Sequence, residues 1–213
     1  MNKSIETIWK NGFLDDDVLI APKVNNLYEK KSIHVIDKFE KMFKINLIMI
    51  FVGSFIFLAG TSFIGLPVTG ICIFFLLNWL VINGKKELVN LNTIDKSVPM
   101  YQYMKSFDQW MDGQIKSYAR LYTFFYPLFF LSFVIGFYFS TNGQLVLSAI
   151  IDKFPDASLL FGIPVVLLTI VAVITAIISY FAAPIYRWEL NLVYGAMIGK
   201  LKDIISDMDE LRT

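Results

Sequence analysis

Three consecutive carboxylates, Asp15, Asp16 and Asp17, are the densest group of chemically active side chains in this 213-residue chain. Such a run can bind a cation, start a helix or contact a partner. A calcium loop needs oxygen ligands at alternate positions, a glycine at the sixth and a bidentate glutamate at the twelfth. Counted from Asp15, those last two positions hold Ile20 and Asn26. The pattern therefore excludes a calcium loop of this kind.

A helix start fits the carboxylates better, because free N–H groups and the helix dipole favour negative charge in a first turn. We expect Asp15 to cap a short turn over residues 18–20 that ends before Pro22. The pair Asn11 and Gly12 is expected to end a separate short helix before it.

The same segment is also a candidate partner-docking surface, because it is rich in apolar side chains without belonging to a membrane span. It would either dock on the protein's own helices or present a groove-binding helix to a cytosolic protein. Trp9 would be the anchor in both cases. The candidate docking residues are Trp9, Phe13, Asp15, Asp16, Asp17 and Leu19.

The remaining reactive side chains do not form a catalytic or metal-binding set. His34 is the single histidine, and Cys72 is the single cysteine. One cysteine excludes an intrachain disulfide and a cysteine zinc cluster. The sequence has no Ser/His/Asp set and no glycine-rich phosphate loop. We therefore expect a non-enzymatic protein with no catalytic residues, metal or cofactor.

Composition and charge distribution indicate a membrane protein. Hydrophobic residues make up 56% of the chain and charged residues 17%, and the charges are segregated. Charged residues and histidine are absent from 45–84, 121–151 and 157–186. A span needs about 20 apolar residues, so the first stretch is long enough for two, with a break at Gly65 and Pro67. The predicted spans are 45–64, 66–83, 121–140 and 159–180.

Basic residues predict the orientation, because Lys and Arg resist translocation. Eighteen of the 19 lie in residues 1–44, 85–120 and 187–213, and the remaining one is Lys153. Both termini and the central loop should therefore be cytoplasmic, with 141–156 as a short outer loop. The net charge of +1 argues against a nucleic-acid partner.

The polar segments show helical periodicity and run into the spans. Apolar residues recur at three- and four-residue steps in 24–44, from a start at Ser97 and Pro99, and beyond the fourth span, where we expect a kink at Pro184. The fold class is therefore all-α: an integral membrane four-helix bundle whose spans extend into a cytoplasmic helical bundle. The expected division is 1–44 (N-terminal helical segment), 45–84 (hairpin of spans), 85–120 (helical loop), 121–186 (second hairpin) and 187–213 (C-terminal helix).

Small residues at four-residue spacing mark the fourth helix as a packing surface, within the chain or between copies. The candidate helix-packing residues are Ala172, Ala176, Ser179, Ala183, Gly195 and Gly199. The spans hold no ionisable residue of the kind that proton relays use. An oligomeric channel or transporter built on this face is nevertheless the alternative function.

Three short motifs carry a resemblance to a known group. Ile8-Trp9-Lys10, Ile20-Ala21-Pro22-Lys23 and Lys31-Ser32, followed by clustered spans, resemble uncharacterised inner-membrane proteins of Bacteroidetes. Some of these are encoded beside extracytoplasmic-function sigma factors. The resemblance implies an anti-sigma-like role in the bacterial inner membrane, although the zinc-binding His/Cys motif of many anti-sigma domains is missing. We therefore expect a membrane protein that contacts the lipid bilayer and whose cytoplasmic helices bind a protein partner, with homo-oligomers as a further option.

Overall fold

The computed structural model describes the backbone of residues 5–95 and 97–210 and the side chains of 33–95 and 97–210. Within these residues the chain forms five helices and one small hairpin, which confirms the predicted all-α class. The helices are α1 (Ile5–Phe63), α2 (Pro67–Asn92), α3 (Met100–Tyr138), α4 (Thr141–Lys153) and α5 (Val165–Glu210), and the strands are β1 (Leu159–Leu160) and β2 (Ile163–Pro164).

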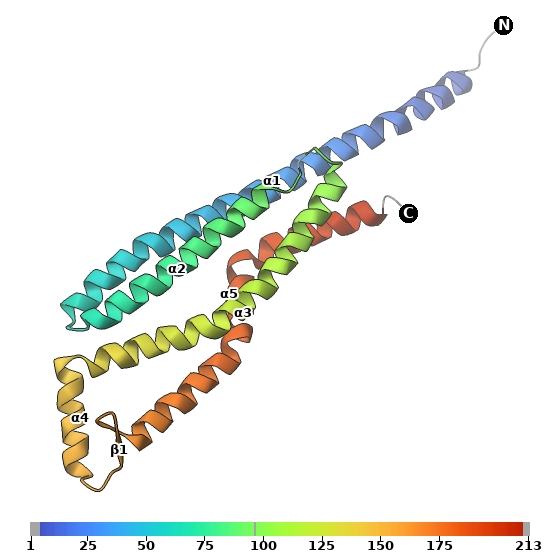
Figure 1. Ribbon diagram of the computed structural model, residues 1–213. Coiled ribbons are helices and arrows are strands. Elements are labelled where there is room, and N and C mark those ends of the chain that lie inside the picture. The colour runs from blue at the N-terminus through green and yellow to red at the C-terminus, as the bar shows by residue number, and fades with distance from the viewer. Residues whose placement is uncertain (1–4, 96, 211–213) are drawn as a thin grey trace.

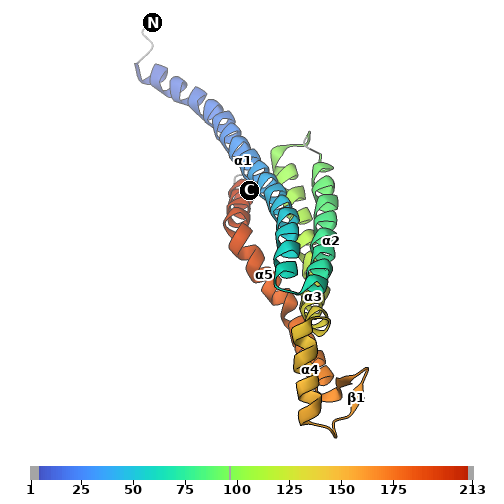
Figure 2. The same cartoon turned by 90° about the vertical axis from the view of Figure 1, so that its left-hand side faces the viewer.

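The long helices run alternately up and down (Figure 1). α1 pairs with α2, α2 with α3, and α3 with α5, while α5 also contacts α1. The start of α1, the end of α5 and the α2–α3 connection lie at one end of the molecule, and α4 with the β hairpin lies at the other (Figures 1 and 2).

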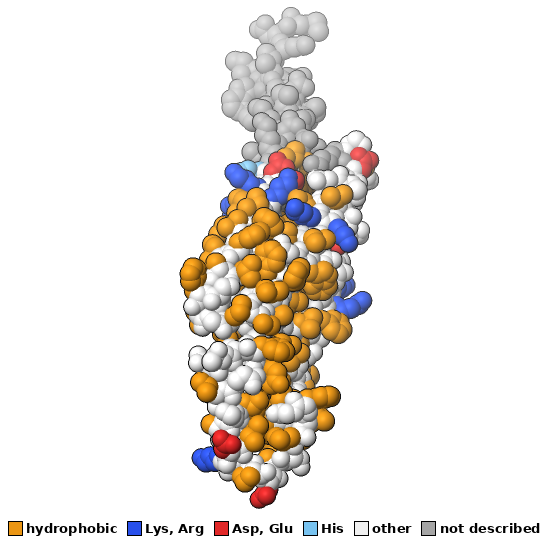
Figure 3. Space-filling view, turned by 60° about the vertical axis from the view of Figure 1, so that its left-hand side comes forward, with side chains coloured by type: hydrophobic (Ala, Val, Ile, Leu, Met, Phe, Trp, Pro, Cys, Tyr) orange, Lys and Arg blue, Asp and Glu red, His pale blue; other side chains and the backbone are white. Residues whose placement is uncertain are grey.

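Four of the helices are long and apolar enough to cross a membrane: α1, α2, α3 and α5. Hydrophobic side chains are spread along the face in Figure 3, and Lys, Arg, Asp and Glu lie near its two ends, with more of them towards the end that holds the α2–α3 connection. The chain is therefore a multi-pass membrane protein.

The predicted break between the first two spans is confirmed. α1 ends at Phe63, Gly65 adopts a φ of 83°, and Pro67 is the first residue of α2. A positive φ suits glycine, and a proline at the first helical position loses no hydrogen bond. The predicted helix start near Ser97 and Pro99 is also confirmed, because α3 begins at Met100.

The helices share a large apolar core at their charged end, which we call the charged-end bundle. Met104, Phe107 and Leu201 are at most 1% exposed at its centre. Its buried residues come from all four long helices: Ile36, Phe39, Leu91, Tyr103, Met104, Phe107, Met111, Tyr194, Met197, Leu201, Ile204 and Met208. The predicted continuation of the spans into a second helical bundle is therefore present.

The apolar part of the helices, which we call the span region, packs through small and hydroxyl side chains. A Cβ atom added to Gly136 of α3 would lie 2.6 Å from the backbone nitrogen of Thr69 in α2. Between α1 and α2, the Asn78 amide donates to the hydroxyl of the fully buried Ser54 over 3.2 Å. Such contacts are typical of helices that associate in lipid.

The structure corrects the predicted breaks in the N-terminal segment. The predicted helix end at Asn11 and Gly12, the cap at Asp15 and the stop before Pro22 are all wrong, because α1 continues through them. A proline removes one backbone hydrogen bond and bends a helix, and these local costs do not end a helix this long. Pro127 and Pro184 likewise lie inside α3 and α5.

The connection between α3 and α5 is more ordered than predicted. Residues 141–153 form α4, whose N-terminus is capped by the Ser140 hydroxyl accepting from the Gly143 amide over 3.0 Å. Residues 159–164, predicted as the start of a span, form the hairpin instead. Phe161 and Gly162 have φ values of 54° and 76°, as a tight two-residue turn requires.

Candidate functional site

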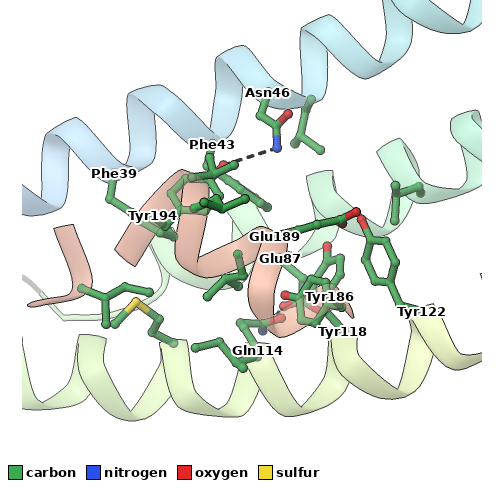
Figure 4. Close-up of a pocket in the computed structure, with 18 of the residues that line it drawn as sticks. Phe39, Phe43, Asn46, Glu87, Gln114, Tyr118, Tyr122, Tyr186, Glu189 and Tyr194 are labelled. Atoms are coloured by element: carbon green, nitrogen blue, oxygen red, sulfur yellow. Dashed lines mark hydrogen bonds between the residues drawn. The ribbon is translucent and has the colours of Figure 1, made fainter. Parts of the chain in front are cut away.

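A half-open cavity of about 390 Å³ lies between α1, α2, α3 and α5, where the charged-end bundle meets the span region (Figure 4). Its wall is mostly apolar and aromatic, with a few polar side chains. The lining residues are Phe39, Phe43, Asn46, Leu47, Ile50, Leu80, Glu87, Trp110, Met111, Gln114, Ile115, Tyr118, Tyr122, Tyr186, Glu189, Leu190, Leu192, Val193, Tyr194 and Ile198.

Helical periodicity directs these side chains into the cavity. Residues 110–122 of α3 contribute one face at three- and four-residue steps, and residues 39–50 of α1 do the same opposite. α5 changes direction between its apolar part and its C-terminal part (Figure 1), and Pro184 lies inside this helix. α5 is therefore bent, and its residues 186–198 supply the remaining wall.

Tyrosine rings form one side of the cavity. The Tyr186 ring stacks on Tyr122 with centroids 4.6 Å apart and an interplanar angle of 21°. It also stacks on Tyr118 at 6.3 Å and 19°. Stacked rings of this kind provide a rigid apolar surface whose faces carry partial negative charge.

The carboxylates of Glu87 and Glu189 line the cavity, and both accept hydrogen bonds from neutral side chains. Glu87 accepts hydrogen bonds from the Gln114 amide and, over 2.9 Å, from the Asn90 amide. Glu189 accepts from the Tyr126 hydroxyl over 2.6 Å. Figure 4 shows Glu87 and Glu189 approaching the cavity from α2 and α5.

Three residues that line the cavity each carry a buried polar atom with no hydrogen-bond partner among the described residues: Trp110 Nε1, Gln114 Oε1 and Tyr118 OH. They lie on the same face of α3. A buried polar group without a partner costs about 1–3 kcal/mol. A ligand with polar atoms of its own can satisfy these atoms when its entry turns the three side chains towards the cavity.

The lining residues carry negative charge only. They include Glu87 and Glu189 and contain no Lys, Arg or His. Neither carboxylate forms an ion pair with any residue that the structure describes. The site therefore combines an apolar wall with uncompensated negative charge.

Metal binding finds no support in the described side chains. Among residues 33–95 and 97–210, no group of three His, Cys, Asp or Glu residues is placed to hold an ion. His34 is exposed and Cys72 is partly buried in α2.

The predicted docking residues Trp9, Phe13, Asp15, Asp16, Asp17 and Leu19 lie outside the residues whose side chains are described. Their backbone belongs to α1, which runs past the charged-end bundle at this end (Figure 1).

The predicted helix-packing residues are in different surroundings. Ser179 contacts α3, donating to the Thr123 carbonyl over 3.2 Å. Ala172, Ala176 and Gly199 are exposed, and Ala183 and Gly195 are partly buried. Ala172 and Ala176 thus remain available to lipid or to another copy of the chain.

Sequence reasoning did not find the cavity. Tyr122, Tyr126, Tyr186 and Glu189 lie close to the ends of the uncharged stretches, where aromatic and charged residues are typical of a membrane interface. Glu87 lies just beyond the second predicted span. Carboxylates close to the ends of spans, with tyrosines nearby, were the signal in the sequence that could have indicated this site. These side chains meet at one cavity only because four helices pack around them, and that packing depends on the whole fold.

Comparison with family models, curated proteins and solved structures finds no match for this chain.

Proposed function

We propose that this membrane protein acts by binding, without catalysis, and that its cavity holds an amphiphilic ligand. The observation that carries the proposal is the set of three buried, unpartnered polar atoms on residues of a mostly apolar wall. An amphiphile would hydrogen-bond to Trp110, Gln114 and Tyr118 while its hydrocarbon part covers the aromatic and aliphatic residues.

Size and position support this ligand class. Small-molecule sites span about 300–1,000 Å³, so a cavity of about 390 Å³ is large enough for a head group and the first part of a chain. The cavity is half open and lies where the apolar span region adjoins the charged-end bundle. An amphiphile can enter such a site with its tail still in the bilayer.

Native mass spectrometry of the full chain in a nonionic detergent, with added phospholipids of one acyl composition, tests the proposal. Leu190→Trp fills the cavity and should abolish a retained lipid adduct. Val89→Trp is the matched control, since Val89 is 62% exposed on α2 and does not line the cavity. Adducts that survive Leu190→Trp as well as they survive Val89→Trp would contradict a ligand in this cavity.

Docking of a cytosolic protein on the N-terminal part of α1 is a second candidate function, and an anti-sigma-like role is one form of it. The continuous helix over residues 5–32, which runs past the charged-end bundle, favours it. Photocrosslinkers at Trp9 and Leu19 of the full chain in cells should capture one recurring cytosolic protein. Crosslinks found only within this protein would contradict the docking of a cytosolic partner.

We further propose a location in a bacterial inner membrane, as the resemblance of the N-terminal motifs implies, and the basic residues support placing both termini in the cytoplasm. Single cysteines at Ser97 and Asp156 in a Cys72→Ser background test this orientation, because both positions are exposed. An impermeant maleimide applied to cells with a permeabilised outer membrane should label position 156 and leave 97 unlabelled until the inner membrane is broken. The reverse pattern would invert the proposed topology.

A further inference from the structure

We infer that the ligand of this cavity carries an ammonium head group and that an aminophospholipid is its source. The inference rests on the proposed function, since it names the chemistry of the amphiphile that the cavity would hold. It follows from the charges, the hydrogen-bonding inventory and the aromatic wall of the site, each taken from the described residues.

The two carboxylates lack a cation. Glu87 is held by amide donors of Gln114 and Asn90, and Glu189 by the hydroxyl of Tyr126. These neutral donors orient the carboxylates and leave their charge in place. Glu189 is exposed and Glu87 is half-buried, so both keep contact with solvent while the cavity is empty. A ligand that covers them removes this water, which is costly unless the ligand brings a positive charge.

The unpartnered atoms add detail to the head group. An ammonium has three N–H donors and no acceptor. Gln114 binds Glu87 through its amide nitrogen and leaves Oε1 buried and free, so an ammonium beside Glu87 would find a second acceptor on the same amide. Trp110 Nε1 can only donate, so it calls for an oxygen on the ligand. A head group with both an ammonium and acceptor oxygens satisfies both requirements.

The tyrosine wall favours the same charge. Tyr118, Tyr122 and Tyr186 line the cavity, and the ring faces that their mutual stacking leaves uncovered attract cations. A desolvated cation–π contact contributes about 2 kcal/mol. An anionic head group would instead meet two carboxylates and no basic lining residue. Phosphatidylethanolamine combines a primary ammonium, phosphate and ester oxygens and hydrocarbon tails, so it is the probe that tests the inference most directly.

The experiment compares phosphatidylethanolamine with phosphatidylglycerol of identical acyl chains, each titrated onto the full chain in dodecyl maltoside and read by native mass spectrometry. We expect the ethanolamine lipid to bind about tenfold more tightly, equivalent to about 1.4 kcal/mol. Replacing both carboxylates, Glu87→Gln with Glu189→Gln, should reduce this preference to less than about twofold. Asp112→Asn removes an exposed α3 carboxylate outside the cavity and should leave the preference unchanged.

The outcomes separate this inference from the proposed function. Equal binding of both lipids to the unaltered protein, lost in Leu190→Trp, would overturn the ammonium assignment and leave the amphiphile site intact. A preference that survives the double glutamine variant would also overturn it. Binding of neither lipid would contradict both proposals. The first comparison needs no variant, so the inference stays testable even if the glutamine variant does not fold.

Discussion

The charged-end bundle and the span region are built from the same four helices and held together by different side chains. In the bundle, large apolar residues such as Phe107 and Met104 are buried, and charged residues cover the outside. In the span region, large apolar residues such as Phe75 face outwards at 68% exposure, and Ser54 and Thr69 are fully buried.

The difference follows from the surrounding medium. In water, burial of apolar area drives association, so the largest side chains belong inside. In lipid that driving force is missing, and close backbone approach with interhelical hydrogen bonds replaces it. One helix can therefore bury its large apolar residues in the charged-end bundle and expose them in the span region. Four substitutions test this contrast.

The largest effect is expected from removing a ring in the bundle core. Phe107→Ala should lower the free energy of unfolding by about 3–5 kcal/mol, because it leaves a cavity where no lipid or water can compensate. Phe107 is 1% exposed. Denaturant titration in mixed micelles measures the change. Phe75→Ala in the span region is the matched control and should change stability by less than about 1 kcal/mol. Comparable losses would contradict the proposed contrast.

The second effect concerns close packing in the span region. Gly136→Ala should destabilise by about 1–3 kcal/mol, because the added methyl group meets the Thr69 backbone and forces α2 away from α3. Gly60→Ala, where nothing lies within 4 Å of the added atom, serves as control and should be neutral or slightly stabilising. The same titration applies. A neutral Gly136→Ala would show that these helices do not depend on close approach.

A smaller loss is expected from the buried hydroxyl between α1 and α2. Ser54→Ala removes the acceptor of the Asn78 amide and should cost about 0.6 kcal/mol, the average for hydrogen bonds between membrane helices. Ser62→Ala is the comparison, because Ser62 is exposed and bonds only to the Leu58 carbonyl of its own helix. Equal effects at the two sites would remove any special role for the interhelical bond.

The smallest effect is expected in the α2–α3 connection. Hydrogen bonds from the Ser97 hydroxyl, at 2.6 Å, and amide, at 2.8 Å, hold the pKa of Asp95 below its ordinary value. A lowered pKa means that this stabilisation is present above the ordinary pKa and lost as pH falls through the folded value. Asp95→Asn should therefore unfold at a slightly lower temperature than the unaltered protein at pH 7, and the difference should shrink as pH falls below the ordinary aspartate pKa. A difference that grew on acidification would have the wrong sign.

Much of the fold was predictable from the sequence because the decisive signals are local. Uncharged stretches marked the four long apolar helices, Gly65 and Pro67 marked the turn, and apolar periodicity showed helices continuing beyond the spans. The errors were also local. Asn11, Gly12 and Pro22 predicted helix ends, but each disturbs only a few backbone hydrogen bonds of a much longer helix.

The candidate site was not predictable by the same means. Glu87, Gln114 and Glu189 come from three helices, and their approach depends on helix rotation and on the change of direction in α5. Gly136 was likewise missed, because its importance comes from Thr69 on another helix. Periodicity identifies the face of a helix but not the partner that covers it.

The uninterrupted course of α1 has a mechanical consequence. At about 1.5 Å per residue, the helix over residues 5–32 is about 40 Å long. A flexible tether of that many residues would let a bound molecule wander through a broad volume, whereas a helical rod fixes its distance and bearing. Any protein bound to the first turns of α1 would lie at a fixed distance from the lipid surface. Rotation or tilt of the first span would move the bound protein sideways relative to that surface.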